Sequence, residues 1–411
     1  MVPLPRRLAR WAVSAAAALS AAGLAPALAP AAHAAPPARA SWTAQATPAP
    51  RLTSAAVLSS VACPTPRTCI AVGYAVDAAG APAPLVERLD GRRWRIQGSV
   101  MPASVTSGFL FGVACATPRS CTAVGSVTRP SLGTIPFAER LDAGRWAAER
   151  VPRPRRRTRG EVDYLGAVSC PGSGVCMAVG YAGNPQGTAG RALTERWTAA
   201  SGWTLEPAPS PARAASSFLS GVSCPSTRSC TAVGFASGRN GVGAALAERW
   251  TPAGWTMQRI PTPAGATLVQ LSGVACPSAS LCMAAGSFQV AGIEVLLAER
   301  WNGARWVIGR PRYPAGARGA ALAEVSCPSV RACTAVGSFT DTPGVGEPLA
   351  ERWTSRGWAI QPTPSPATAA DPLNAGLAGV SCPSLTRCVA VGSATPLSGE
   401  GGEPVSLSWG T

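Results

Sequence analysis

Residues 219–257 read LSGVSCPSTRSCTAVGFASGRNGVGAALAERWTPAGWTM, and this stretch contains the unit on which the fold depends. It divides into four short apolar runs. The first ends at Cys224, the second starts at Cys230, the third occupies residues 246–250, and the fourth begins at Gly254. Runs of about 4–6 residues bounded by Pro, Gly and Ser are typical of β-strands. The stretch therefore predicts four consecutive strands, named a to d.

The same unit recurs seven times along the chain, and each copy carries two cysteines with five residues between them. Successive first cysteines lie 51 to 55 residues apart. The pairs use all 14 cysteines and are Cys63/Cys69, Cys115/Cys121, Cys170/Cys176, Cys224/Cys230, Cys276/Cys282, Cys327/Cys333 and Cys382/Cys388. Four strands per unit of about 50 residues predict an all-β, seven-bladed β-propeller with four-stranded blades.

The tryptophans of strand d indicate how the ring closes. Six units carry this residue, at Trp94, Trp146, Trp203, Trp255, Trp306 and Trp358. The seventh unit ends at Trp409 in strand c and has no strand d, whereas residues 41–45 near the N-terminus match residues 202–206. We therefore predict a propeller over residues 42–411 in which residues 42–48 complete blade 7, so that no sheet edge is left open.

Each cysteine pair predicts one disulfide within its blade. Residues i and i+6 can lie opposite each other across a five-residue hairpin connection, within the range that a disulfide accepts. A metal site would need about four ligands, and isolated cysteine pairs without histidine do not supply them. We expect no metal and no cofactor.

The N-terminal residues resemble an export signal. Arg6, Arg7 and Arg10 precede an apolar run over 11–29, and Ala32-His33-Ala34 offers the small residues that a signal peptidase reads. We predict a signal peptide over 1–34, cleaved after Ala34, a short linker over 35–41, and a secreted protein. The sequence does not decide whether the protein is exported unfolded or already folded. No later segment reaches the ~20 apolar residues of a membrane span.

Composition excludes several classes of protein. Of 411 residues, 46% are hydrophobic and 14% are charged, which argues against disorder, and 40 Pro with 44 Gly argue against a helical bundle. The net charge is +16, and every one of the 36 basic residues is arginine. Because the single histidine, His33, lies in the predicted signal, histidine-dependent catalysis is excluded.

A Glu-Arg pair in strand c recurs in six units and is interpreted as structural, since catalysis needs one site. Glutamates on the apolar face of a strand need partners. The candidates are the arginines of the cysteine hairpins, Arg67, Arg119, Arg228 and Arg331. The recurrent tryptophans are interpreted as core, with sugar stacking as the alternative.

The segment 150–159 is the most distinctive connection, with six arginines in ten residues. On an exposed loop it predicts an anionic partner, such as a cell-envelope polymer or an acidic glycan. The candidate ligand-binding residues are Arg153, Arg155, Arg156, Arg157 and Arg159. Nucleic acid fits the charge but not the predicted export.

An enzyme is the rival class, because propellers host glycosidases that use pairs of carboxylates. Acids outside strand c are present but form no recognisable motif: Asp77, Asp163, Asp341, Glu400 and Glu403. We predict a non-catalytic binding or scaffolding module, expected to be a monomer with a protein or an anionic polymer as partner. A lectin-like propeller is the alternative, and a glycosidase-type hydrolase is less favoured.

The order of an apolar strand, an Ala-Val-Gly strand and a turn leading to Trp resembles the repeats of Asp-box propellers and of photosystem-II assembly-factor propellers. The resemblance is greatest to cysteine-rich secreted propeller repeats of actinobacteria, and it covers residues 42–411. Residues 142–146, DAGRW, are the nearest fragment to an Asp-box, which is intact in none of the units. The resemblance therefore implies the fold but not sialidase activity.

Overall fold

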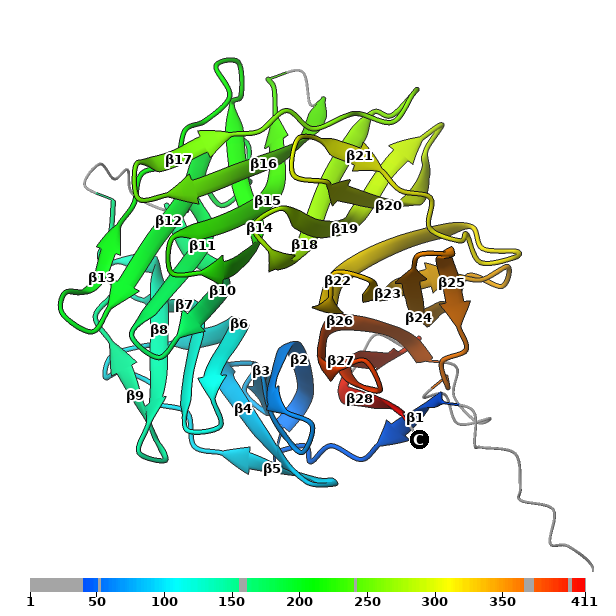
Figure 1. Ribbon diagram of the computed structural model, residues 1–411. Coiled ribbons are helices and arrows are strands. Elements are labelled where there is room, and N and C mark those ends of the chain that lie inside the picture. The colour runs from blue at the N-terminus through cyan, green and yellow to red at the C-terminus, as the bar shows by residue number, and fades with distance from the viewer. Residues whose placement is uncertain are drawn as a thin grey trace, which may run out of the picture. The chain divides into compact units, whose positions relative to one another are not determined.

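The computed structural model describes residues 40–50, 53–154, 161–239, 242–365, 373–397 and 401–410. The described residues contain 28 β-strands, and blades 1 to 7 follow one another around a centre (Figure 1). Strand a of each blade is innermost and strand d is outermost. The predicted seven-bladed, all-β propeller is confirmed.

All blades share this a-to-d order, and the strands have the following bounds. Blades 1 to 3 contain β2 (Thr53–Thr65), β3 (Thr68–Asp77), β4 (Pro82–Asp90) and β5 (Arg93–Gln97); β6 (Ser107–Thr117), β7 (Ser120–Arg129), β8 (Gly133–Asp142) and β9 (Arg145–Glu149); and β10 (Val162–Gly172), β11 (Val175–Gly183), β12 (Gly190–Thr198) and β13 (Gly202–Leu205). Blades 4 and 5 contain β14 (Ser216–Ser226), β15 (Ser229–Ser237), β16 (Gly243–Thr251) and β17 (Gly254–Met257); and β18 (Leu268–Ser278), β19 (Leu281–Val290), β20 (Ile293–Trp301) and β21 (Trp306–Ile308). Blades 6 and 7 contain β22 (Gly319–Ser329), β23 (Ala332–Thr340), β24 (Gly346–Thr354) and β25 (Gly357–Gln361); and β26 (Leu373–Ser384), β27 (Arg387–Pro396), β28 (Glu403–Gly410) and β1 (Ser41–Gln45).

The two ends of the described chain meet in blade 7. Strand β1 pairs antiparallel with β28, and Trp42 lies opposite Trp409. Figure 1 shows β1, in blue, beside β28, in red. The predicted closure by an N-terminal strand is therefore confirmed.

Blades 2 and 3 form one continuous sheet, although a similar parallel bridge, Ala55 to Gly402, also links blade 1 to blade 7. A single parallel bridge between Thr134 and Val162 connects them into one eight-stranded sheet, whereas the remaining five blades are separate four-stranded sheets.

The Ala-Val-Gly motif of strand b has a steric cause. Strand a of every blade contains a bulge, which brings its backbone over strand b. In blade 4, a Cβ at Gly234 would overlap the carbonyl oxygen of Phe218, and the equivalent glycines of the other blades are equally crowded. Because only glycine lacks a Cβ, the bulge requires it there.

The seven predicted disulfides are all present, and each joins strand a to strand b of its own blade across six positions. They are Cys63–Cys69, Cys115–Cys121, Cys170–Cys176, Cys224–Cys230, Cys276–Cys282, Cys327–Cys333 and Cys382–Cys388. In blade 2 the register places Cys115 directly opposite Cys121. The pairing predicted from the spacing is therefore confirmed.

The second cysteine of each pair is buried in the core, which the sequence analysis did not predict. Its exposed fraction lies between 0% and 3% in all seven blades, at Cys69, Cys121, Cys176, Cys230, Cys282, Cys333 and Cys388. The reason is that this residue belongs to strand b rather than to the hairpin connection, and its side chain packs between blades. The sulfur atoms of Cys176 and Cys282 lie 3.5 and 3.6 Å from threonine Oγ1 atoms of the preceding blade. The disulfides are thus part of the packing between blades as well as links within them.

Serines that precede a cysteine add a hydrogen bond between blades. The backbone N–H of Cys224 donates to Ser169 Oγ at 3.0 Å. The same bond joins Cys276 to Ser223 at 2.9 Å. Each such serine lies in strand a of the preceding blade, so these bonds connect the inner strands around the ring.

The hydrophobic core lies between the blades. Each of the seven core clusters combines residues of two neighbouring blades, as where Val389 and Val391 of blade 7 pack with Leu85 and Trp94 of blade 1. The strand-d tryptophans belong to these clusters. The indole N–H of Trp146 donates to Gln97 Oε1 of the preceding blade at 3.1 Å, and that of Trp306 donates to Gln258 Oε1 at 3.0 Å.

Candidate functional site

The arginine of the strand-c Glu-Arg motif holds neighbouring blades together. The guanidinium of Arg140, in blade 2, lies 3.5 Å from the ring centroid of Trp197 in blade 3. Arg196 lies 5.4 Å from Trp250 of blade 4, and Arg352 lies 4.3 Å from Trp409 of blade 7. These are cation–π contacts between the strand-c arginine of one blade and the strand-c tryptophan of the next. We call this contact the blade clamp.

The blade clamp includes hydrogen bonds to the cysteine hairpin of the next blade. Arg352 Nη2 donates to the carbonyl of Leu385 at 2.8 Å, and Arg140 Nη2 donates to that of Ser173 at 3.4 Å. Arg88 Nη1 donates to the equivalent carbonyl of Pro118 at 3.0 Å, although blade 2 carries Leu141 at the tryptophan position. The recurrent arginine is thus a structural device, as the sequence interpretation expected.

The boundary between blade 7 and blade 1, which we call the closure seam, carries neither half of the clamp. Blade 7 has Ser408 at the arginine position and blade 1 has Leu89 at the tryptophan position. Ser408 Oγ lies 3.1 Å from Thr43 Oγ1 of the same blade. The inner strands still share a core across the seam, so the difference is confined to the outer strands.

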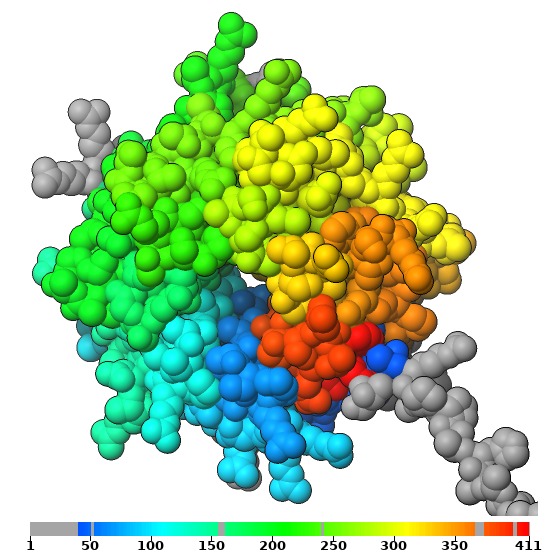
Figure 2. Space-filling view, viewed as in Figure 1, coloured from blue at the N-terminus to red at the C-terminus, as the bar shows by residue number. Residues whose placement is uncertain are grey.

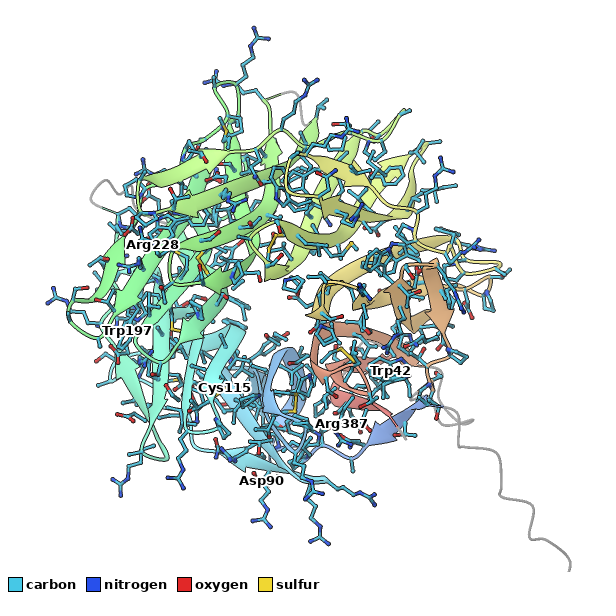
Figure 3. All side chains as sticks on the ribbon, in the orientation of Figure 1. Trp42, Asp90, Cys115, Trp197, Arg228 and Arg387 are labelled. Carbon is cyan, nitrogen blue, oxygen red and sulfur yellow. A yellow bond between two sulfur atoms is a disulfide. The ribbon has the colours of Figure 1, made fainter. Side chains whose placement is uncertain are left out.

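A groove of about 770 Å³ lies at this unclamped edge. We call it the closure groove. It is lined by β1 and the residues that follow it, by β27 and β28 of blade 7, and by the β4–β5 turn and β5 of blade 1. The lining residues are Thr43, Ala44, Gln45, Ala46, Thr47, Pro48, Arg92, Arg93, Trp94, Arg95, Arg387, Ser408, Trp409 and Gly410. Figure 3 shows Trp42 and Arg387 on blade 7 and Asp90 on the adjacent blade 1.

Four arginines give the closure groove its charge. Arg92, Arg93 and Arg95 are exposed, and Arg387 is half-buried with a buried Nε that has no hydrogen-bond partner among the described residues. None of the four forms an ion pair within the described ranges. The adjacent carboxylate of Asp90 is paired with Arg88, 3.0 Å from its Nε. Arginine forks bind carboxylate and phosphate groups through two parallel hydrogen bonds, so the groove is chemically suited to an anion.

The closure groove was not among the predicted sites, although the amino-acid sequence contains a signal for it. Blade 1 reads GRRWR over 91–95, whereas strand-d tryptophans of other blades have fewer flanking arginines. The loss of Glu-Arg in blade 7 was visible too, as Leu407-Ser408. What the sequence did not reveal is that both irregularities meet at one boundary.

The predicted arginine segment is only partly described. Arg153 is half-buried, and its Nη2 donates to the carbonyl of Leu132 at 3.2 Å, which anchors the segment to the preceding blade. The remaining candidate residues, Arg155, Arg156, Arg157 and Arg159, lie outside the described residues.

The strand-d tryptophans are buried in the core. Their exposed fractions lie between 3% for Trp306 and 8% for Trp255, with Trp42, Trp94, Trp146, Trp203 and Trp358 between these values. Rings buried to this extent cannot stack on a sugar. The core interpretation is therefore confirmed for these residues, and any sugar site lies elsewhere.

The expected pairing of the strand-c glutamates with hairpin arginines is wrong. Arg67, Arg119, Arg228 and Arg331 are exposed at the hairpin tips, whereas the six glutamates are fully buried in the middle of strand c. Glu139 accepts from Ser99 Oγ and from the N–H of Val100, and Glu351 accepts from the N–H of Arg312 at 2.8 Å. These donors belong to the connection from the preceding blade.

The other four glutamates have no partner for their carboxyl oxygens among the described residues: Glu87, Glu195, Glu248 and Glu299. Burial raises the pKa of Glu87, Glu248 and Glu299 to about 8. Burial and the charge of Asp163 raise the pKa of Glu195 to about 9. Glu139 and Glu351 reach a pKa of about 7, because hydrogen bonds to the carboxylate oppose burial. Glu87, Glu195, Glu248 and Glu299 are therefore mostly protonated near neutral pH.

The loop acids weighed for catalysis are dispersed. Asp77 and Asp341 each lie at the end of a strand b, and each accepts two backbone N–H bonds within its own turn. Asp163 is buried and Glu403 is exposed, while Glu400 lies outside the described residues. Within the described part of the chain, no group of three or more His, Cys, Asp or Glu could hold a metal ion. No helix there is suited to crossing a membrane.

Comparison with known proteins relates the fold to solved propellers. No family model and no curated protein matches the chain. The BP39L lectin from Burkholderia pseudomallei is similar in structure, with a TM-score of 0.50 and 17% identity over 87% of this chain and 96% of the lectin. This likeness concerns the propeller fold. A sialidase from Trypanosoma rangeli is also similar, with a TM-score of 0.48 and 8% identity over 87% of this chain. The matched region covers 54% of the sialidase, so this chain spans about half of its length.

Proposed function

We propose that this protein is an exported, non-catalytic binding propeller whose ligand is an anionic polymer of the cell envelope or an acidic glycan. The closure groove carries this proposal. Four arginines without ion-pair partners among the described residues line it, and a linear anion would contact blades 7 and 1 at once. Guanidinium groups recognise phosphate and carboxylate equally, so the two ligand classes share one chemistry.

Charge and disulfides support the proposal. A net charge of +16 attracts polyanions over a distance set by ionic strength. Seven disulfides are typical of a protein that folds in an oxidising compartment outside the cytosol, which agrees with the export signal proposed over residues 1–34.

The non-catalytic part of the proposal is supported by the use of the carboxylates. Glycoside hydrolysis needs two carboxyl groups about 5–10 Å apart across one bond. Here Asp77 and Asp341 are turn acceptors on different blades, and the strand-c glutamates are enclosed in the core. Neither set belongs to the lining of the closure groove.

A lectin that binds neutral sugars is the second candidate. BP39L, which has a similar fold, is a lectin. For this chain the buried strand-d tryptophans do not supply a stacking surface, so a neutral sugar would need hydroxyl and amide partners instead. An acidic glycan unites the two candidates, because it is both a sugar and a polyanion.

The test is calorimetric titration of the secreted protein with polyphosphate, polygalacturonate and neutral dextran. The variant Arg92→Ser/Arg93→Ser/Arg95→Ser removes three charges from the groove. The matched control, Arg145→Ser/Arg305→Ser/Arg356→Ser, removes three exposed charges from the same c–d turn region of blades 2, 5 and 6.

We expect polyanion binding to weaken about tenfold or more in the groove variant, since several charge-assisted contacts are lost, and to change little in the control. The preferred polymer distinguishes phosphate from carboxylate ligands. Equal losses in the two triple variants would refute a defined groove. Salt-insensitive binding of dextran would instead support the neutral lectin.

A further inference from the structure

The innermost strands of all seven blades enclose a central cavity of about 240 Å³. Figure 2 shows the ring hollowed at its centre. The cavity lies at the bulges of strand a, at the position two residues after a buried leucine. This position, which we call the bulge position, is held by Ser60, Gly112, Ala167, Gly221, Gly273, Glu324 and Gly379.

Small residues at the bulge position are a steric requirement in most blades. A Cβ at Gly112 would lie 2.9 Å from the Cα of Ala167 in the next blade, and one at Gly379 would lie 2.9 Å from the Cα of Ser60. Such distances are too short for a side chain. Blade 6 departs from this rule by carrying a glutamate, Glu324.

Glu324 fits because the preceding blade makes room for it. A Cβ at Gly273 would overlap Glu324 Oε1, so the carboxyl group lies against bare backbone. The same Oε1 accepts from the N–H of Val325 at 2.9 Å. None of the residues that line the cavity is basic, and burial raises the pKa of Glu324 to about 8. This carboxyl group therefore has no counter-charge in the cavity.

An aromatic ring lines the same cavity. Phe111 of blade 2 stands at a position where the other blades have Ser, Gly or Ala. It is a member of a continuous series of ring contacts, stacking on Phe109 at 6.0 Å and meeting Tyr164 edge-on at 5.8 Å. Blade 2 lies three blades from blade 6 in a ring of seven, so Phe111 and Glu324 face the cavity from nearly opposite sides.

Four serines complete the polar lining, namely Ser59, Ser60, Ser220 and Ser272. They, Phe111 and Glu324 are only partly buried, so solvent reaches the cavity. A carboxyl group without counter-charge, an aromatic ring and hydroxyl acceptors are the groups that recognise an ammonium ion. A calcium ion would need 6–8 oxygen ligands, and a single carboxylate with scattered hydroxyls suits it poorly.

We propose that the central cavity binds a compact organic cation, an alkylammonium group such as that of a lysine side chain or a free amine. The ammonium group pairs with the carboxylate of Glu324, and its alkyl part contacts Phe111. Binding requires Glu324 to lose its proton to solvent, so occupancy increases as the pH rises toward 9. This site is separate from the closure groove and does not depend on the function proposed for it.

The experiment is saturation-transfer NMR on the secreted protein with n-butylammonium chloride as probe, at pH 6.5 and pH 9. We expect binding about tenfold tighter at pH 9, and no binding of the neutral analogue n-pentanol. Glu324→Gln should abolish the pH dependence and weaken binding about tenfold, and Phe111→Leu should weaken it less. The control Glu403→Gln removes an exposed carboxylate away from the cavity and should bind as the wild type does.

A second variant, Glu324→Gly, introduces the residue that blades 2, 4, 5 and 7 carry. It keeps the test valid if the glutamine variant does not fold. Butylammonium binding that survives in both Glu324 variants would overturn the proposal. So would equal binding at the two pH values, or displacement of the probe by millimolar calcium chloride.

Discussion

The boundary between blades 2 and 3 and the closure seam differ in the side-chain contacts between their outer strands. A parallel strand bridge links the backbones at both boundaries, Thr134 to Val162 and Ala55 to Gly402. At the former, Arg140 stacks on Trp197 and donates to the carbonyl of Ser173 at 3.4 Å. At the latter, Ser408 and Leu89 leave the outer strands unclamped, and β1 is held without a c–d turn of its own. The groove lined by arginines lies at the closure seam.

This difference shows that the residues of each repeat determine the contacts between neighbouring blades as well as the fold of the blade itself. Arg140, Arg196 and Arg352 each contact the tryptophan of the following blade, so an irregular unit alters the boundaries on both of its sides. Where arginine and tryptophan are both missing, surface that would be filled becomes available to a ligand. The predictions below test this contrast.

The largest effect is expected from the strand that closes the ring. Trp42→Ala should lower the free energy of unfolding by about 4 kcal/mol, because it empties a buried site in a strand that no turn connects to β28. Trp203→Ala removes the equivalent side chain from a strand that a turn tethers to β12, and it should cost about 3 kcal/mol. Both tryptophans pack against the preceding blade, Trp42 against blade 6 and Trp203 against blade 2, so the comparison isolates the effect of the missing turn. Guanidinium denaturation measures the free energy of unfolding of both variants. A smaller loss for Trp42→Ala than for Trp203→Ala would contradict this prediction.

The residue of blade 7 at the strand-c glutamate position indicates how the buried glutamates affect stability. Leu407 replaces the strand-c glutamate there and is buried, so Glu248→Leu copies a residue that the fold already accepts. The folded-state pKa of Glu248, about 8, exceeds the ordinary value of 4.5. The unfolded chain therefore loses this proton first, and the stability of the wild type falls as the pH rises from about 4.5 to about 8.

Glu248→Leu should consequently match the wild type near pH 4.5 and exceed it by about 3 kcal/mol near pH 7. Denaturation curves at several pH values measure the difference. Glu139→Leu is the matched comparison and should gain less, because it removes the bonds from Ser99 and Val100. A pH-independent effect of Glu248→Leu would contradict the buried, protonated carboxyl group.

The clamp itself is expected to contribute a smaller amount. Arg140→Ala should lower the free energy of unfolding by about 2 kcal/mol through loss of the cation–π contact and two hydrogen bonds. Ser408→Ala, at the equivalent position of the seam, should change it by less than about 0.5 kcal/mol. Similar losses in the two variants, measured by urea denaturation, would show that the clamp does not distinguish the boundaries.

The smallest change in free energy is expected from rebuilding the clamp at the seam. Leu89→Trp/Ser408→Arg supplies both missing side chains and should fill part of the closure groove. We expect polyphosphate binding to weaken about tenfold, equivalent to about 1.4 kcal/mol, with a small rise in melting temperature. Titration calorimetry and thermal unfolding check the two effects. Unchanged binding in a more stable variant would place the ligand outside the groove.

The fold could be predicted from the sequence because its signals are repeated. Fourteen cysteines, the strand-b glycines and the displaced Trp42 each constrain the chain at a regular interval, and their physical causes are local. Contacts between blades could not be predicted in the same way. The donors to Glu139 and Glu351 come from the connection of another blade, and the second cysteine of each pair is buried by a neighbouring blade.

Charge density along the chain and the closed ring point to different candidate sites. The densest arginine segment, 150–159, is the obvious signal in the sequence. The closure groove arises instead from residues as distant in the chain as Arg92 and Arg387, which only the closed ring brings together.

Hydrogen–deuterium exchange followed by mass spectrometry tests the central claim most directly, because it compares every boundary in one experiment. Without ligand, the amides of β1 and β28 should exchange faster than those of β12 and β13, since the closure seam lacks the blade clamp. With polyphosphate added, protection should increase in β1, β28 and β5 and stay constant at the boundary between blades 2 and 3. Uniform exchange around the ring, or protection that increases elsewhere while the seam is unchanged, would contradict the account.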